Sequence, residues 1–393
     1  MDGTLLAILS GRDRPGVSAS VFDSLRHAPI EVLDIQQIVV RGRLVLAVLL
    51  GLSADSVGDT RAALHAEASR LGMEIETVPG ASIVRKDPER RRIHVTVMAQ
   101  RLRPGAVAEI TRRIAERGWN IDRIRRIASY PVTAVVFEGS GEDMADLRRE
   151  LSEAAATLDV DVAVQHAGLD RRGQRLVVMD VDSTLIQDEV IDLLAEQAGS
   201  LDAVAAITER AMRGEIDFAQ SLRERVALLE GLPARALEET AARIRLTPGA
   251  RTLCRTLRRL GFRVCLVSGG FTEIIAPLAQ QLEVDGLRAN ELEVRDGKLT
   301  GRVVGAIVDR EGKRAALEGF AREFGIPLAR TIAIGDGAND LDMLDTAGLG
   351  IAFNAKPVVR AAADTSVNAP YLDSVLFLLG ITREEIEEAD ADD

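Results

Sequence analysis

The second half of the chain contains four short apolar runs, and the longer segments between them carry apolar residues at helical spacing. The runs lie at 176–179, 264–267, 331–334 and 349–352. Short buried strands that alternate with helices form a parallel sheet covered by helices on both faces, and ligands bind such sheets at the carboxyl ends of the strands. We therefore predict an α/β domain over residues 168–393, with its functional residues directly after the apolar runs.

Two acids follow the first apolar run, in the segment Asp180-Val181-Asp182-Ser183-Thr184. Carboxylates at positions i and i+2 of a strand end share one face of the strand and repel each other. Because crowded charges gain little from packing, a cation or a phosphate reaction has to account for them. The pair suits Asp180 as a carboxylate nucleophile and Asp182 as the general acid beside it, with a hard divalent cation between them.

Histidine does not occur in the half of the chain that carries these acids. A mechanism of the Ser-His-Asp type and a histidine-bound zinc site are therefore excluded there, and carboxylates must transfer the protons. The four histidines all precede residue 167: His27, His65, His94 and His166.

Two further segments could bind a phosphate group. Ser268-Gly269-Gly270 offers a hydroxyl group and unhindered backbone N–H groups, although the same sequence also occurs in plain loops. Lys313 is one of four lysines among 49 basic residues. A compact ammonium suits a single phosphate oxygen better than a guanidinium does, so we assign Lys313 to the phosphate; the alternative is an exposed surface lysine.

The third strand ends in the segment Gly335-Asp336-Gly337-Ala338-Asn339-Asp340, which places two acids and an amide on a glycine-rich turn. Helix capping needs one such residue, not three. Mg²⁺ takes an octahedral shell of oxygen ligands. We predict that Asp336 completes such a shell beside the carboxylate of Asp180 and the backbone carbonyl of Asp182.

Two insertions interrupt the predicted sheet. About 80 residues separate Thr184 from Ser268, whereas a crossover between parallel strands needs only about a dozen. Residues 188–244 have helical periodicity, and we expect them to cap the strand ends and exclude water. Residues 292–304 contain Asp296-Gly297, a strong hairpin signal.

The first half of the chain repeats itself at a spacing of about 89 residues, counted from the sequence. Residues 4–10 and 93–99 read as strands, and each is followed by an Arg-Pro-Gly turn and a helical segment. We predict two ferredoxin-like β-α-β-β-α-β domains, at 1–80 and 92–167, joined by a linker at 81–92.

Composition limits the partners and the location. The net charge of −12 argues against nucleic acid, and the basic stretch 85–126 holds one aromatic residue, Trp119, so we interpret it as a solvated surface or a salt-bridged surface between domains. The start Met1-Asp2-Gly3 lacks the features of a secretory signal and no apolar stretch reaches 18 residues, so we expect a cytoplasmic protein without membrane contact. Cys254 and Cys265 are predicted to be buried thiols, and 384–393 a frayed acidic tail.

The four segments 180–184, 268–270, Lys313 and 335–340, in this order, resemble the haloacid-dehalogenase superfamily of phosphatases. The cap segment around Phe218 and Arg225 is similar to that of the phosphoserine phosphatases within it. This resemblance implies a Rossmann-like core and Mg²⁺-dependent hydrolysis of O-phospho-L-serine to L-serine, the last step of serine biosynthesis, through an aspartyl-phosphate.

The resemblance also implies roles for single residues. Arg225 would bind the substrate carboxylate and Glu189 its ammonium group, while Met212 and Phe218 would form apolar walls or, equally, pack in the core. The phosphate would be held by Ser268, the Gly269 N–H, Lys313 and Asn339, and Asp340 would support the metal ligands.

Both N-terminal repeats resemble the ACT domain, a module that commonly binds amino acids and pairs edge to edge with a second copy. The resemblance implies a homodimer and a regulatory site at the glycine of a Pro-Gly turn, either Gly16 or Gly105. Serine, the expected product, would be the effector. Gly16 is favoured because Asp13 lies close enough to meet an ammonium group, although both glycines also suit ordinary turns.

Three alternatives remain at this level. The first is a related phosphatase that acts on another small phosphomonoester or on a phosphoprotein. The second is an amino-acid-sensing regulatory protein, against which the complete set of acids and phosphate binders argues. The third is transfer of the phosphoryl group from the aspartyl-phosphate to a second alcohol.

Overall fold

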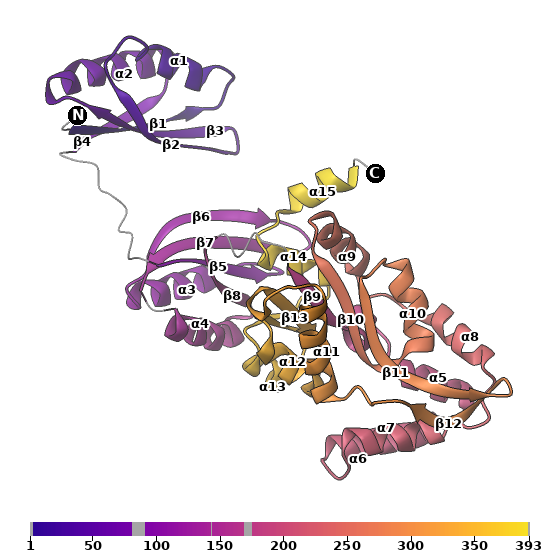
Figure 1. Cartoon of the computed structure of the whole chain (residues 1–393). Coiled ribbons are helices and arrows are strands. Elements are labelled where there is room, and N and C mark those ends of the chain that lie inside the picture. Colours follow the sequence, from indigo (N-terminus) through magenta and orange to yellow (C-terminus); the bar gives the residue numbers. More distant parts are fainter. Residues whose placement is uncertain (1–2, 81–90, 143, 169–174, 392–393) are drawn as a thin grey trace. The chain divides into compact units, whose positions relative to one another are not determined.

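The computed structural model describes residues 3–80, 91–142, 144–168 and 175–391 (Figure 1). The chain forms two compact units, Met1–Pro88 and Glu89–Asp393. The first unit contains one of the two sequence repeats, and the second contains the other repeat together with the α/β half. The predicted linker at 81–92 lies almost wholly outside the described residues.

The first unit is a four-stranded antiparallel sheet in the order β2-β3-β1-β4, with two helices on one face (Figure 1). Alternate residues of β1 and β3 are buried against these helices, as the period of two along a strand requires. The predicted β-α-β-β-α-β order is confirmed. Its elements are β1 (Gly3–Arg12), α1 (Val17–Asp23), β2 (Glu31–Val40), β3 (Arg43–Leu52), α2 (Val57–Leu71) and β4 (Glu74–Gly80).

The second repeat has the same topology, with the strand order β6-β7-β5-β8. Its elements are β5 (Arg91–Ala99), α3 (Pro104–Glu116), β6 (Asn120–Ala128), β7 (Thr133–Gly141), α4 (Ala145–Leu158) and β8 (Asp161–His166). In the basic stretch, arginines of α3 pair with acids of the same helix, and Trp119 is buried in the core. These ion pairs lie within one helix and not between domains, so these arginines match the alternative of a solvated surface.

The two Pro-Gly segments differ in structure. Gly16 precedes α1 with φ +91°, a left-handed conformation that favours glycine. Pro104 and Gly105 instead lie inside the first turn of α3, where proline is favoured because its missing N–H needs no partner. The prediction of a turn at both glycines is therefore wrong for Gly105.

The α/β half is a seven-stranded sheet in the order β12-β11-β10-β9-β13-β14-β15, in which neighbouring strands from β11 to β15 run parallel. The four predicted strands are confirmed and lie at its centre. The strands are β9 (Leu176–Asp180), β10 (Arg263–Phe271), β11 (Gly286–Arg295), β12 (Lys298–Val304), β13 (Thr331–Gly335), β14 (Leu349–Phe353) and β15 (Thr365–Val367). The helices around it are α9 (Ala250–Arg259), α10 (Thr272–Gln281), α11 (Arg310–Glu323), α12 (Leu341–Thr346), α13 (Pro357–Ala362), α14 (Val375–Leu378) and α15 (Arg383–Ala391).

Four helices between β9 and β10 form the predicted cap: α5 (Val190–Ala198), α6 (Leu201–Met212), α7 (Phe218–Ala227) and α8 (Arg235–Arg243). The two chain segments that join the cap to the sheet lie side by side, because Ile186 pairs with Leu246 and the Gln187 N–H donates to the Arg245 carbonyl. The second insertion is a hairpin of β11 and β12 with Asp296 and Gly297 at its tip, as predicted; both have positive φ.

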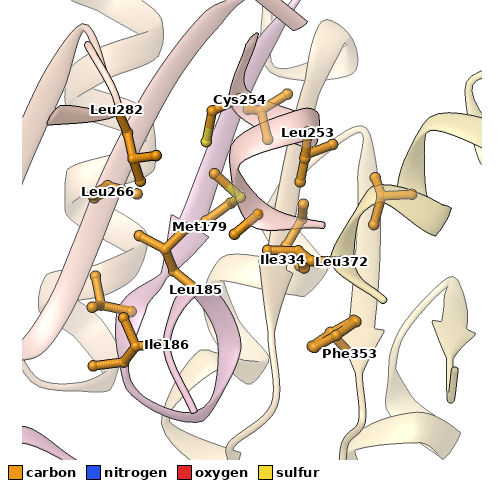
Figure 2. Packing of buried hydrophobic residues seen from close by; sticks show 14 of the residues in the cluster. Met179, Leu185, Ile186, Leu253, Cys254, Leu266, Leu282, Ile334, Phe353 and Leu372 are labelled. Atoms are coloured by element: carbon orange, nitrogen blue, oxygen red, sulfur yellow. The ribbon is translucent and has the colours of Figure 1, made fainter. Parts of the chain in front are cut away.

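Apolar side chains from the central strands and the flanking helices fill the core of this half. In Figure 2, Met179 of β9 lies among Leu266 of β10, Ile334 of β13 and Leu185. This packing fixes the end of β9, from which the two predicted catalytic acids project. Cys254 and Cys265 are buried free thiols, as predicted.

The acidic C-terminal segment differs from the prediction. Residues 383–391 form α15 instead of a frayed tail, because Ile386 is buried and Asp390 pairs with Arg255 and Arg259 of α9. None of the helices within the described ranges has the length and apolar content that a membrane crossing requires.

Side chains tie the second repeat to the sheet. The buried Asp161 carboxylate at the start of β8 accepts hydrogen bonds from the Asn368 N–H, the Asn368 Nδ2 and the Ser366 Oγ, at 2.9, 2.6 and 3.1 Å. Thr365 Oγ1 donates to the Val162 carbonyl at 2.8 Å, and Arg148 of α4 pairs with Asp364 at 2.7 Å.

Candidate active site

The two acids predicted to be catalytic lie at the end of the central strand β9. Asp180 Oδ1 accepts hydrogen bonds from the Val181 N–H and pairs with Lys313 Nζ, both at 2.8 Å. Asp182 accepts from the Val190 N–H at the start of cap helix α5, at 2.8 Å, and from Ser268 Oγ at 2.9 Å. The two carboxylates are therefore held in fixed orientations by groups from the sheet and from the cap.

Lys313 is buried, with 1% of its surface exposed, which contradicts the alternative of a surface lysine. It lies in the first turn of α11, and its Nζ contacts Asp180 Oδ1 and Asp340 Oδ1 at 2.8 and 2.7 Å. Burial alone would lower the pKa of Lys313, but the two carboxylates outweigh this effect and raise it. Lys313 therefore stays charged in the site.

Two more acids, Asp336 and Asp340, follow the end of β13 and lie close to Asp180. Carboxylate oxygens of Asp180, Asp336 and Asp340 lie within 4.8 Å of one another, close enough to share one cation. Asp340 already binds Lys313 with Oδ1 and accepts from the Gly337 N–H with Oδ2 at 2.9 Å. Both oxygens of Asp340 are therefore occupied, which fits the prediction that Asp340 supports the site instead of binding a cation directly.

Glycine is required beside these acids for steric reasons. A side chain at Gly335 would collide with the carboxyl group of Asp340, and one at Gly337 would collide with the amide of Asn339. The glycine-flanked turn recognised in the sequence therefore allows both polar groups to fold back against the strand end.

The acids outnumber the bases at this site. Burial is the main cause that raises the pKa of Asp180, Asp182 and Asp336, in the last case to about 6, and repulsion by Asp340 adds to it for Asp180 and Asp336. One buried lysine cannot neutralise four clustered aspartates. The donor set, which consists of carboxylate oxygens with excess negative charge, fits a hard divalent cation such as Mg²⁺.

A cavity of about 140 Å³ connects these acids to the cap. Glu189, Phe218 and Arg225 line it from the cap side, opposite Gly269 and Asn339. The other lining residues are Asp180, Asp182, Ile191, Leu222, Gly270, Lys313, Asp336 and Gly337. Nine of the predicted site residues therefore face one small polar cavity.

The cap residues differ in their surroundings. Glu189 accepts a hydrogen bond from Ser183 Oγ at 2.6 Å, and burial together with Asp182 raises its pKa to about 7. Phe218 contacts residues 268–270, the predicted phosphate loop. A Cβ at Gly269 would lie 3.0 Å from the Phe218 ring. Met212, at the end of α6, is 67% exposed and is not among the lining residues of this cavity.

Sequence reasoning did not identify two buried polar residues that belong to the site. Thr184 donates to Asp336 Oδ1 at 3.2 Å and so links the ends of β9 and β13. Asn290, on β11, bonds to the predicted phosphate loop. No clear sequence signal pointed to Asn290, because charged residues such as Arg288 and Glu291 stand beside it in the same strand.

The sequence matches the haloacid dehalogenase-like hydrolase family over residues 177–345, and ACT domains over residues 3–78 and 93–165. A phosphoserine phosphatase of Streptomyces coelicolor is 56% identical over 99% of this chain and 96% of its own length. The chain belongs to the phosphoserine phosphatases. One from Mycobacterium tuberculosis is 50% identical, with the same coverage of 99% and 96%.

A solved structure described as a phospho-aspartyl intermediate analogue of phosphoserine phosphatase is 42% identical to this chain, with a TM-score of 0.50. It covers 52% of this chain and 98% of its own length. The predicted fold class, a haloacid-dehalogenase core preceded by two ACT domains, is therefore confirmed, and the chain is an enzyme of the phosphoserine phosphatase family.

Proposed function

We propose that this phosphatase hydrolyses O-phospho-L-serine to L-serine and phosphate through an aspartyl-phosphate on Asp180. The observation that carries the proposal is the single cavity that joins Asp180 and Asp182 to Glu189 and Arg225. The cavity thus combines a nucleophile and an acid with one group of each charge, as a phosphorylated amino acid requires.

In the first step, Asp180 attacks phosphorus in line and the bond between phosphorus and the serine oxygen breaks. Lys313 and the Val181 N–H hold Asp180 Oδ1 and so fix the plane of the attacking carboxylate. Asp182 gives its proton to the leaving serine oxygen. Burial raises the pKa of Asp182, which favours the protonated form that this step needs.

In the second step, water attacks the phosphorus of the aspartyl-phosphate, Asp182 takes the proton from this water, and Asp180 is released with free phosphate. The Gly269 N–H, Lys313 and Asn339 hold the charge of the phosphoryl group in both steps, and the Ser268 hydroxyl group, which donates to Asp182, would join them by turning towards the phosphoryl group. The cap excludes other acceptors, which favours water over transfer to a second alcohol.

Mg²⁺ would be held by Asp180, Asp336 and the backbone carbonyl of Asp182. When bound, it supplies positive charge that neutralises the phosphoryl oxygens. Thr184 orients the Asp336 carboxylate for this role, and Asp340 keeps Lys313 beside Asp180.

Substrate choice is assigned to the cap. Arg225 is a partly buried guanidinium that binds the substrate carboxylate, and Glu189 binds the ammonium group. Phe218 forms the apolar wall against Gly269. We assign Met212 to the opposite wall, which requires the cap to move towards the sheet when substrate binds.

A phosphate-release screen tests the proposal with O-phospho-L-serine, O-phospho-L-threonine, a phosphopeptide and para-nitrophenyl phosphate. Arg225→Ala should reduce kcat/KM for phosphoserine by about 10- to 150-fold, the effect of losing a charged hydrogen-bonded pair, and leave para-nitrophenyl phosphate nearly unchanged. Arg223→Ala, an exposed arginine on the same helix, is the control.

The outcomes separate the alternatives. Preference for phosphopeptide, or equal losses of both substrates in Arg225→Ala, would contradict the assigned substrate. Absence of turnover with Mg²⁺ on every substrate would favour the amino-acid-sensing protein.

We further propose that the chain is a homodimer that pairs through the first ACT domain. Strand β2 lies at the edge of its sheet, where unpaired backbone groups are available to a second strand. Its exposed apolar residues are Val32, Ile35, Ile38, Val39 and Val40. Ile38→Lys should therefore shift the mass measured by light scattering from dimer towards monomer.

Serine is the proposed effector of the ACT domains, and the two glycines offer a matched pair of variants. Alanine at Gly16 is strained because φ is +91°, whereas alanine at Gly105 suits the first turn of α3. Serine inhibition should weaken in Gly16→Ala and in Asp13→Ala but persist in Gly105→Ala. Identical inhibition in all three variants would assign it to product binding at the active site.

A further inference from the structure

Asn290 is a fully buried amide that bonds to two segments of the active site at once. Its Nδ2 donates to the Gly269 carbonyl at 2.8 Å, and its Oδ1 accepts from the Val308 N–H, also at 2.8 Å. Gly269 belongs to the phosphate loop, residues 268–270, which interrupts the ladder within β10, and Val308 lies two residues before α11, whose first turn carries Lys313. Asn290 therefore connects the two proposed phosphate-binding segments.

The sheet itself explains why a side chain is needed here. The parallel ladder between β10 and β11 is regular up to Val267 and resumes at Phe271, which pairs with Asn290. Residues 268–270 leave the ladder, so the Gly269 carbonyl, which is half-buried, requires another partner. The Asn290 amide supplies this partner, while residues 268–270 remain outside the ladder.

Further hydrogen bonds link the segment that Asn290 holds to Asp182. The Gly269–Gly270 peptide is held by Asn290 at its carbonyl and by Ser268 Oγ at its N–H, the latter at 2.8 Å. Ser268 Oγ in turn donates to Asp182 Oδ2 at 2.9 Å. Glycine rotates freely about its backbone bonds, so a loop with two glycines needs such an anchor to keep one conformation.

We infer that Asn290 is a positioning residue for phosphoryl transfer: it fixes the phosphate loop relative to Lys313 and, through Ser268, orients Asp182. The inference rests on the proposed function. It predicts a loss in the chemical step instead of a loss in substrate affinity, because the cap groups that bind the serine part are not connected to Asn290 by these bonds.

Asn290→Leu removes both hydrogen bonds at similar volume. The kcat should fall by about 10- to 100-fold with both phosphoserine and para-nitrophenyl phosphate, and KM should change by less than about threefold. Thr331→Val is the matched control. Thr331 is also buried, donates to the Leu328 carbonyl and accepts from the Gly348 N–H, but it lies at the opposite end of β13 from the site. It should lose comparable thermal stability and keep kcat.

Asn290→Asp tests the inference through the pH dependence of kcat, which a purely structural role would not change. The carboxylate keeps the acceptor for Val308 but repels the Gly269 carbonyl, whereas its protonated form donates to that carbonyl again. The ratio of variant to wild-type kcat should therefore rise several-fold as the pH falls from 8 to 5.5. If Asn290→Leu does not fold, the pH dependence of Asn290→Asp decides whether Asn290 positions the phosphate loop.

The two levels of the proposal fail separately. Wild-type protein without phosphatase activity would overturn the proposed function. Active wild-type protein, together with an unchanged kcat in Asn290→Leu or a ratio independent of pH in Asn290→Asp, would overturn the role of Asn290.

Discussion

Two sets of buried carboxyl groups in the second unit differ in what surrounds them. At the active site, Asp180 and Asp340 pair with one buried lysine, and Asp182 and Asp336 lie close by. At the junction between the second ACT domain and the phosphatase sheet, Asp161 stands alone and accepts three hydrogen bonds from neutral donors. Both sets are costly to bury and both accept hydrogen bonds, but only the active site gathers several like charges around one lysine.

The difference shows how to separate a working site from a structural joint. A carboxylate that has no like charges beside it and whose oxygens meet neutral donors needs no further ligand, so removing it should cost stability and not activity. Clustered acids with a deficit of positive charge lack such compensation, so removing one should cost activity and not stability. The predictions below test this contrast.

The largest expected effect concerns the nucleophile. Asp180→Asn should lower turnover by at least about 10⁴-fold, because an amide does not form the aspartyl-phosphate. The free energy of unfolding without metal should stay equal or increase, because one of several like charges is removed. Acid-quenched single-turnover reactions and urea unfolding measure the two quantities.

Asp182→Asn should lower turnover less, by roughly 10²- to 10⁴-fold, the range for a lost general acid. Turnover near the wild-type level in Asp180→Asn, or a loss of stability as large as that of Asp161 variants, would break the comparison.

The second prediction concerns the cation. Activity should require Mg²⁺ and disappear after dialysis against EDTA, whereas Ca²⁺, which prefers more ligands and longer bonds, should bind and support turnover poorly. At 100 times its dissociation constant Mg²⁺ should stabilise the fold by about 2.7 kcal/mol. The stabilisation should persist in Asp161→Asn and be lost in Asp336→Ala.

Full activity in excess EDTA would contradict the metal assignment. Equal stabilisation by Mg²⁺ in Asp336→Ala would show that the cation binds elsewhere.

The same contrast explains what the sequence revealed. The active-site acids were recognisable because two carboxylates after an apolar run have no packing benefit, and this made Asp180 and Asp182 conspicuous. The strand and helix periods likewise predicted four strands of the seven-stranded core, the cap and both β-α-β-β-α-β domains. Asp161 gave no such signal, because a single acid at the start of a strand is common, and its partners lie more than 200 residues away.

Other features that the sequence did not reveal also depend on partners from elsewhere in the chain. Asn290 and Thr184 act through hydrogen bonds to other segments, which spacing along the chain does not encode. The acidic end was predicted to fray because its charges are alike, whereas Arg255 and Arg259 of α9 neutralise Asp390 only after the chain has folded. Tertiary partners therefore decided the cases that local pattern left open.

The smallest expected effect is the pH dependence of the junction. Burial raises the pKa of Asp161 from 3.8 to about 6. The folded state therefore binds this proton more tightly than the unfolded state, so the contribution of Asp161 to stability is full below about pH 4. It is lost as the pH rises towards 6 and remains lost above it.

Asp161→Asn isolates this contribution, because an amide does not titrate and the other raised carboxyl groups remain in both proteins. The amide of the variant also points an N–H group at the donors that bond to the Asp161 carboxylate. This lowers the stability of the variant by an amount that does not vary with pH. The free energy of unfolding of the wild type minus that of the variant should therefore decrease by about 2 to 3 kcal/mol between pH 4 and pH 7, while kcat stays within about twofold. A difference that is constant with pH, measured by urea unfolding, would show that Asp161 does not titrate in this window, and a lost kcat would place the junction within the catalytic machinery.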